Sequence, residues 1–149
     1  MNKDLKYDRI KKQIEELCAP IQNPMSRMAT INAVLHNKMK TFFWTGFYLL
    51  TEDGELEVGP YQGELACLRL KKHTGVCWAG IDRKETIIVA DVHQFDGHIA
   101  CNSLSKSEIV IPLEKDGEII GVFDVDSDKA NSFDKIDAKH LESIMKLIY

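Results

Sequence analysis

The sequence has no apolar run that approaches the roughly 20 residues of a membrane-spanning helix, so we expect no membrane span. Its first residues, Met-Asn-Lys-Asp-Leu-Lys, contain no apolar stretch typical of a secretory signal. We therefore expect a cytoplasmic protein. Basic residues are not in excess, and the formal net charge of −4 argues against a nucleic-acid partner. No repeat, low-complexity tract or linker interrupts the 149 residues, so we expect one domain over 1–149.

Cysteine is scarce, and none of the four cysteines forms a C-x-x-C pair. This excludes a zinc ribbon and a thioredoxin-type redox motif. A framework of structural disulfides is not expected in a reducing cytoplasm either. Cys18 falls on the apolar face of a predicted helix, and we interpret it as structural. Cys67, Cys77 and Cys101 lie closer together and need another explanation.

Hydrophobic periodicity predicts helices at both ends of the chain and strands between them. Apolar residues recur every three or four positions over 3–18, and Asn23-Pro24 opens a second helix, so that the N-terminal helices span 3–38. The sheet and a polar loop occupy 41–126, and a last helix covers 133–148. We expect an α+β fold, a largely antiparallel sheet of about six strands with helices packed on it. The predicted strands are 41–50, 56–60, 65–70, 86–90, 107–113 and 118–126.

The last two strands predict a cluster of carboxylates. A three-residue loop at 115–117 pairs Glu108 with Asp124, and Asp124 shares its face with Asp126 by the period of two. A two-residue loop would put Glu108 on the opposite face. The apolar neighbours expected on this face are Val110, Ile120 and Val122. Carboxylates on an apolar face are costly unless they are paired or protonated, so we expect raised pKa values there.

The strand over 41–50 is rich in aromatic residues. Alternation puts Trp44, Gly46 and Tyr48 on one face, together with Phe42 and Leu50. Two aromatic walls with a gap between them could hold a small apolar group. Ordinary core packing explains the same pattern, and the sequence alone favours it.

The segment 91–101 is dense in titratable residues and ends on Cys101, which makes that thiol a candidate nucleophile. Cys77 falls in the first turn of a short helix that starts near Gly75, where a helix N-terminus favours a thiolate. A metal site is an alternative, but zinc ligands usually come in pairs two to four residues apart. Its ligands would be Cys67, Cys77, Cys101, His93 and His98.

Several short motifs taken together resemble the free methionine-(R)-sulfoxide reductases, small single-domain proteins of the GAF fold. The motifs are Gly59-Pro60-Tyr61-Gln62-Gly63, Ala66-Cys67, Gly75-Val76-Cys77, Asp91-Val92-His93, Gly97-His98-Ile99-Ala100-Cys101 and Ser107-Glu108-Ile109-Val110. The resemblance runs from about Trp44 to the end, and the cysteine spacings of 10 and 24 residues match the family. Most GAF domains lack all three cysteines. Trp78 and Asn102 depart from the family, whose members often carry a small residue and Asp there.

The resemblance implies a role for each motif residue. Cys101 matches the catalytic cysteine, Cys67 the resolving cysteine, and Cys77 a further redox-active cysteine. Trp44 and Tyr48 match the residues that hold the methylthio end of the substrate. The acidic residues of the pocket, which bind substrate and supply a proton, are matched by Glu108, Asp124 and Asp126.

The implied activity is thiol-based reduction of free L-methionine-(R)-sulfoxide, an antioxidant repair reaction. A sulfenic acid on Cys101 condenses with Cys67 to a disulfide, which thioredoxin reduces. No metal or organic cofactor is required. The oligomeric state stays open, with a homodimer among the options. A GAF domain that only senses a small ligand is the alternative function, and tight binding of a cyclic nucleotide or tetrapyrrole without turnover would favour it.

Overall fold

The computed structural model describes residues 2–98, 101 and 103–149. Of the positions singled out above, Ile99 and Ala100 of the Cys101 motif and Asn102 lie outside the described residues. The helices and strands follow in the order α1 (Lys3–Cys18), α2 (Pro24–Lys38), β1 (Trp44–Leu50), β2 (Leu56–Gln62), β3 (Arg69–Leu70), α3 (Gly75–Arg83), β4 (Ile87–Val89), η1 (Val92–Gln94), β5 (Ser107–Lys115), β6 (Glu118–Ser127) and α4 (Lys135–Met145).

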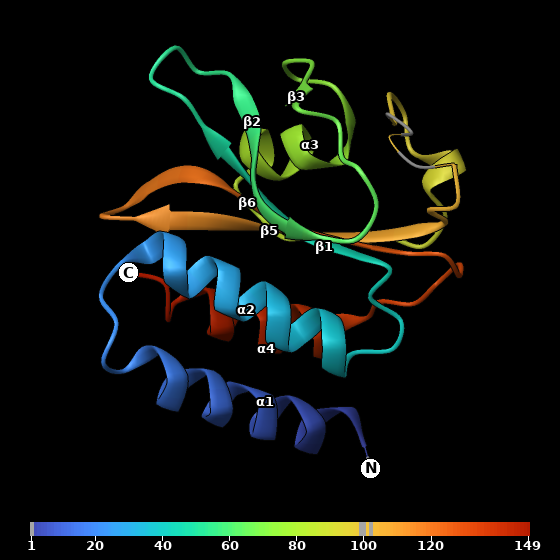
Figure 1. Cartoon of the computed structure of the whole chain (residues 1–149). Coiled ribbons are helices and arrows are strands. Elements are labelled where there is room, and N and C mark those ends of the chain that lie inside the picture. Colours follow the sequence, from blue (N-terminus) through green and yellow to red (C-terminus); the bar gives the residue numbers. More distant parts are fainter. Residues whose placement is uncertain (1, 99–100, 102) are drawn as a thin grey trace.

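The strands form one six-stranded antiparallel sheet in the order β3-β2-β1-β6-β5-β4, which confirms the predicted α+β fold. Helices α2 and α4 lie along one face of the sheet, and α1 packs on the far side of these two helices (Figure 1). Helix α3 lies on the opposite face, against β5 and β6. One face of the sheet is therefore covered by α2 and α4, with α1 outside them, whereas α3 covers only part of the other face.

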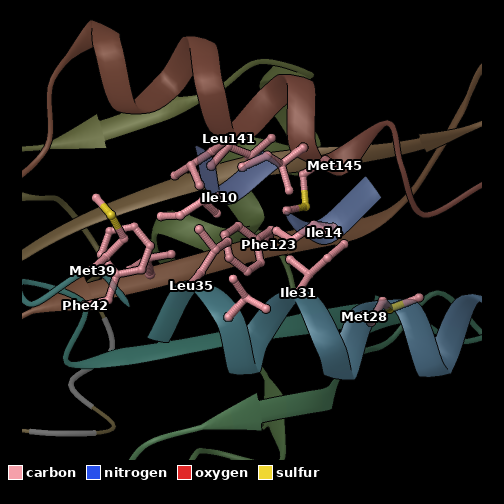
Figure 2. Packing of buried hydrophobic residues seen from close by; sticks show 14 of the residues in the cluster. Ile10, Ile14, Met28, Ile31, Leu35, Met39, Phe42, Phe123, Leu141 and Met145 are labelled. Atoms are coloured by element: carbon pink, nitrogen blue, oxygen red, sulfur yellow. The ribbon is translucent and has the colours of Figure 1, made fainter. Parts of the chain in front are cut away.

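The helix-covered face holds the larger hydrophobic core. Side chains from α1, α2, α4 and the sheet meet there, among them Ile10, Leu35, Phe123 and Leu141 (Figure 2). Cys18 is buried in this core, as expected for a structural residue. Helices α1 and α2 begin where the sequence predicts, and Asn2 and Asn23 accept backbone N–H bonds at their N-termini. The predicted last helix over 133–148 is too long, because Asp134 caps α4, which begins at Lys135 and ends at Met145. No helix in the described part of the chain is long and apolar enough to cross a membrane.

Three strands are shorter than predicted. β1 begins at Trp44, and Phe42 packs into the helical core and not beside Trp44. β3 contains only Arg69 and Leu70, which leaves Cys67 in the preceding connection. β4 loses one residue at each end. In the connection before β3, the carbonyls of Glu64 and Cys67 accept hydrogen bonds from side chains of β1.

The turn between β5 and β6 has two residues, so the predicted three-residue loop is wrong. Asp116 and Gly117 have φ values of 53° and 82°, and Lys115 pairs with Glu118. Positive φ at both positions is the type I′ geometry that Asp-Gly favours. This turn alone would place Glu108 opposite Val125, but a shift of register beside the turn pairs it with Asp126, and Asp124 pairs with Val110.

An irregularity beside this turn keeps Glu108 on the predicted face. Glu114 pairs with Ile119, whereas Leu113 pairs with Gly121, so Ile120 is an extra residue on β6. A bulge of one residue reverses the face of everything beyond it, which cancels the effect of the shorter loop. Ile120 itself packs against the helical core, contrary to the prediction that it neighbours the carboxylates.

Candidate active site

Two adjacent rows of the sheet bring the predicted acidic and aromatic residues together. In the first row Trp44 of β1, Asp126 of β6 and Glu108 of β5 are direct neighbours. In the second row Gly46 lies opposite Asp124. Residues that pair directly across antiparallel strands point to the same face, so all five lie on the face opposite the three helices.

The three carboxylates are crowded and withdrawn from water. Burial is the largest cause that raises the pKa of Glu108 well above its usual range, and the charges of Asp124 and Asp126 add to the shift. Burial and the charge of Asp124 raise the pKa of Asp126 well above its usual range. Burial also raises the pKa of Asp124, although its hydrogen bonds with Glu108 and Cys77 oppose the shift. The cluster therefore keeps protons at a pH where ordinary carboxylates have lost them.

The aromatic residues of β1 form a single wall. The rings of Trp44 and Tyr48 stack with centroids 5.8 Å apart, and Tyr61 stacks on Trp44 at 5.3 Å. The indole lies over Gly46, where an added Cβ would come within 2.5 Å of it. The indole thus fills the space over the glycine, which agrees with the ordinary packing that the sequence alone favours and not with the alternative of a gap between Trp44 and Tyr48.

The polar ends of these two rings hold the connection that carries Cys67. Trp44 Nε1 donates to the Glu64 carbonyl at 3.0 Å, and the Tyr48 hydroxyl donates to the Cys67 carbonyl at 3.1 Å. Burial, together with the charges of the nearby carboxylates, raises the pKa of Tyr48, so the phenol remains a donor. The aromatic wall thus positions the chain around Cys67.

Cys67 and Cys101 form a disulfide with Cα atoms 5.6 Å apart, which is the pairing that the resemblance implies. Cys77 lies in the first turn of α3, as predicted, and is buried. Its predicted thiolate character is wrong. Burial and the charges of Asp124, Glu108 and Asp126 raise the pKa of Cys77 well above that of a free thiol.

The residues described above surround one cavity of about 50 Å³. A single water molecule needs roughly 10–15 Å³, so the cavity has room for more than one water. Seven of the eight predicted site residues line it, and the eighth, Cys67, joins it through the disulfide. The lining consists of Trp44, Tyr48, Leu65, Ala66, Leu70, Thr74, Gly75, Val76, Cys77, His98, Cys101, Ser105, Glu108, Asp124 and Asp126. None of these described lining residues is Lys or Arg.

Sequence reasoning missed some of this lining. His98, considered above only as a possible metal ligand, lines the cavity with Nε2 3.9 Å from Glu108 Oε1. Burial and the charge of His93 lower the pKa of His98. Ser105 is also buried at the cavity. Both residues come from the irregular segment between β4 and β5. Such a segment has no periodicity that could assign a face. Trp78, which differs from the small residue common in the family, does not line the cavity, and its Nε1 donates to the Leu70 carbonyl.

The N-terminus of α3 also faces the cavity. Thr74 occupies the N-cap position, but its side chain makes no cap hydrogen bond and donates instead to the Lys72 carbonyl at 3.2 Å. Gly75, Val76 and Cys77 of the first turn line the cavity. The amides at the start of a helix lack intrahelical acceptors, so this turn can receive an anionic group.

Comparison with known proteins agrees with this architecture. A family profile described as GAF domain matches residues 30–148. The chain is 39% identical to the free methionine-R-sulfoxide reductase of Escherichia coli, over 97% of this chain and 87% of that protein. It is 44% identical to the Saccharomyces cerevisiae protein of the same name, over 70% and 60% of the two chains.

Solved structures show the same relationship. The free methionine-R-sulfoxide reductase of Neisseria meningitidis, solved in complex with its substrate, superposes with a TM-score of 0.95. It shares 40% identity, and the match covers 99% of this chain and 89% of that one. The fold and the cavity thus define a GAF domain with paired cysteines beside buried acids. Within the GAF-domain proteins, the chain belongs to the free methionine-R-sulfoxide reductase family.

Proposed function

We propose that this protein reduces free L-methionine-(R)-sulfoxide to methionine by thiol chemistry. The observation that carries the proposal is the Cys67–Cys101 disulfide beside a cavity that contains three crowded carboxyl groups. The names of the relatives support the substrate, because two of them are free methionine-R-sulfoxide reductases and a third was solved with its substrate bound.

The cavity offers a complementary group for each end of a free amino acid. The carboxylate cluster suits the ammonium group of the substrate, because the described residues that line the cavity include no Lys or Arg to neutralise the acids. The uncapped first turn of α3 suits the α-carboxylate. The aromatic wall of Trp44 and Tyr48 suits the methylthio end. A residue within a peptide has neither charged terminus, so the arrangement favours the free amino acid.

Reduction needs a nucleophile and an acid at the same time. The thiolate of Cys101 attacks the electrophilic sulfoxide sulfur, and a protonated carboxyl group among Glu108, Asp124 and Asp126 donates to the sulfoxide oxygen. The oxygen is transferred to Cys101 as a sulfenic acid, and methionine is released with its sulfur reduced by two electrons. Crowding supports this assignment of the acid, since it keeps a proton on the cluster.

Regeneration uses the second cysteine. The Cys67 thiol attacks the sulfenic sulfur of Cys101, which forms the disulfide and releases the oxygen as water. An external dithiol, thioredoxin in this proposal, then takes up the oxidising equivalents by thiol–disulfide exchange. The reducing cytoplasm regenerates such dithiols, and we place the reaction there.

A set of three cysteine variants tests the proposal. Cys101→Ser should abolish methionine release from free methionine-(R)-sulfoxide, because serine cannot accept the oxygen. Cys67→Ser should release one methionine per chain and then stop, with a sulfenic acid trapped on Cys101. Cys18→Ser, in the helical core, is the matched control and should turn over normally. Full turnover by Cys101→Ser would refute the assignment.

A further inference from the structure

Cys77 has no part in the steps described above, although it reaches the centre of the site. Its Sγ and one carboxylate oxygen each of Glu108 and Asp124 all lie within 4.8 Å of one another. All three residues are buried. A thiolate with two carboxylates is a donor set that Zn²⁺ accepts. Tetrahedral coordination needs S···O separations of roughly 3.6 Å, which small side-chain rotations can supply.

A second observation points to a missing ligand at the same place. Asp124 is only 5% exposed, and its Oδ1 is buried without a hydrogen-bond partner among the described residues. A buried acceptor without a partner is costly, and native proteins usually satisfy it with protein, water or an ion. Asp124 lines the cavity, and the unpaired oxygen belongs to the same carboxylate that lies within 4.8 Å of Cys77 Sγ.

We infer that this cavity binds one thiophilic divalent cation, for which Zn²⁺ is the probe, through Cys77, Glu108 and Asp124. Binding displaces the Cys77 proton and any carboxyl protons of the two acids, so the cation supplies the positive charge that the lining lacks. None of the three ligands belongs to the disulfide, and the site is therefore complete in the oxidised protein.

The cation would occupy the space proposed for the substrate ammonium group. Bound Zn²⁺ should therefore inhibit, and this regulatory consequence rests on the proposed function. In a single-turnover assay of the reduced protein, Zn²⁺ should raise the apparent KM for methionine-(R)-sulfoxide, and a chelator should restore it. The binding itself does not depend on the reaction and can be measured separately.

The decisive experiment uses the full chain with the disulfide intact, so that Cys67 and Cys101 cannot act as ligands. Zn²⁺ is titrated against a chromophoric indicator, and one site per chain is expected. Cys77→Ser and Asp124→Asn should each weaken binding by at least about tenfold, since removal of mere supporting groups commonly costs that much. Co²⁺ should give a near-ultraviolet thiolate charge-transfer band that Cys77→Ser abolishes.

Two control variants distinguish Zn²⁺ binding at this site from non-specific binding of Zn²⁺ to other acids and thiols. Asp126→Asn removes an acid of the same cavity that is not a ligand but hydrogen-bonds the ligand Glu108, so it should weaken Zn²⁺ binding less than the ligand variants do and keep the Co²⁺ band. Cys18→Ser removes the other free thiol and should retain both the Zn²⁺ affinity and the band. Thermal melts establish that each variant is folded. Undiminished Zn²⁺ binding by Cys77→Ser, an equal loss in Asp126→Asn, or no binding at all would overturn the inference. Turnover without Zn²⁺ binding would leave the proposed function standing, and Zn²⁺ binding without turnover would remove the function and keep the site.

Discussion

Glu108 shows how neighbours change the chemistry of one residue. Its side chain is almost fully buried, opposite Asp126 and on the same face as Asp124. Burial and these charges raise the pKa of Glu108 well above its usual range. The same crowding that suits the carboxyl cluster to its proposed role as the acid makes it unfavourable for folding, because ionised carboxylates repel one another.

The variant Glu108→Gln should separate these two effects. Methionine release should fall by about 100-fold or more, since a neutral amide cannot act as the acid. The free energy of unfolding should rise by about 1 kcal/mol at pH 8. In the wild type, a raised folded-state pKa gives stability that is complete below the usual carboxyl pKa of about 4.3 and is lost as the pH rises through the folded value. Thermal melts from pH 4 to 9 with a chelator present measure this.

The sign of the pH dependence is the critical part of that measurement. The stability difference in favour of Glu108→Gln should grow as the pH rises. A difference that stays constant or shrinks with pH would show that Glu108 is not held protonated in the folded protein. The conservative variant Glu108→Asp, which keeps an acid, serves as the control for activity.

At the scale of elements, β1 determines the shape of the cavity. Gly46 leaves the space into which the Trp44 indole folds, and β1 approaches β2 closely there. An added Cβ would lie 2.4 Å from Tyr61 Cβ and 2.5 Å from the Trp44 ring. Both contacts are much closer than side chains tolerate, so the indole would have to leave its place beside Tyr48.

Gly46→Ala should therefore destabilise the fold by about 1–3 kcal/mol, as overpacking does, and lower activity by displacing the aromatic wall. Gly59→Ala is a matched control in β2. Its added Cβ would meet the flexible end of Leu49 at 3.1 Å, and the cost should be smaller. Chemical denaturation of both variants measures the difference. Equal stability of the two would show that Trp44 does not depend on the glycine.

Local features of the helices and strands were predictable from the sequence. The start of α1 was predictable from apolar periodicity and that of α2 from Asn23-Pro24, whereas α4 begins at Lys135, after the Asp134 cap, and not at the predicted residue 133. The face shared by Asp124 and Asp126 was predictable because strand alternation is local. The position of Glu108 on that face was predicted from a wrong loop length and came out right, because the bulge at Ile120 compensates.

Other features depend on contacts that one strand cannot reveal. Alternation placed Trp44 and Tyr48 on one face, but the side-chain torsions that fold the indole over Gly46 are set by packing against Tyr61. The protonated state of Cys77 likewise results from carboxylates on other elements. The helix N-terminus favours a thiolate at Cys77, but burial and the neighbouring carboxylates have the larger effect and raise the pKa of the thiol.

At the scale of the whole molecule, α1 is attached far from the cavity through a buried polar contact with α4. The Tyr7 hydroxyl donates to Asp137 Oδ1 at 2.5 Å, and Lys3 Nζ lies 2.6 Å from Asp137 Oδ2. Burial and the charge of Asp137 raise the pKa of Tyr7, so the phenol keeps its proton. This contact lies on the helix-covered side of the sheet and should contribute to stability and not to catalysis.

Tyr7→Phe should lower the free energy of unfolding by about 1.5–3 kcal/mol, the usual contribution of a hydrogen bond to a charged group. Methionine release by the folded protein should be unchanged. Tyr149→Phe, the same change at an exposed ring, is the control and should leave stability as it is. A loss of activity in folded Tyr7→Phe would contradict the separation of the two faces.

The central claim is that the cavity accepts a free amino acid and reduces its R-sulfoxide. It is tested most directly by measuring methionine formation from free methionine-(R)-sulfoxide, free methionine-(S)-sulfoxide and a peptide containing methionine-(R)-sulfoxide. The assay supplies an excess of dithiol and a chelator. We predict turnover of the free R form alone, because the proposed site binds both charged termini and presents Cys101 to one face of the sulfoxide. Comparable turnover of the peptide-bound form would contradict the account.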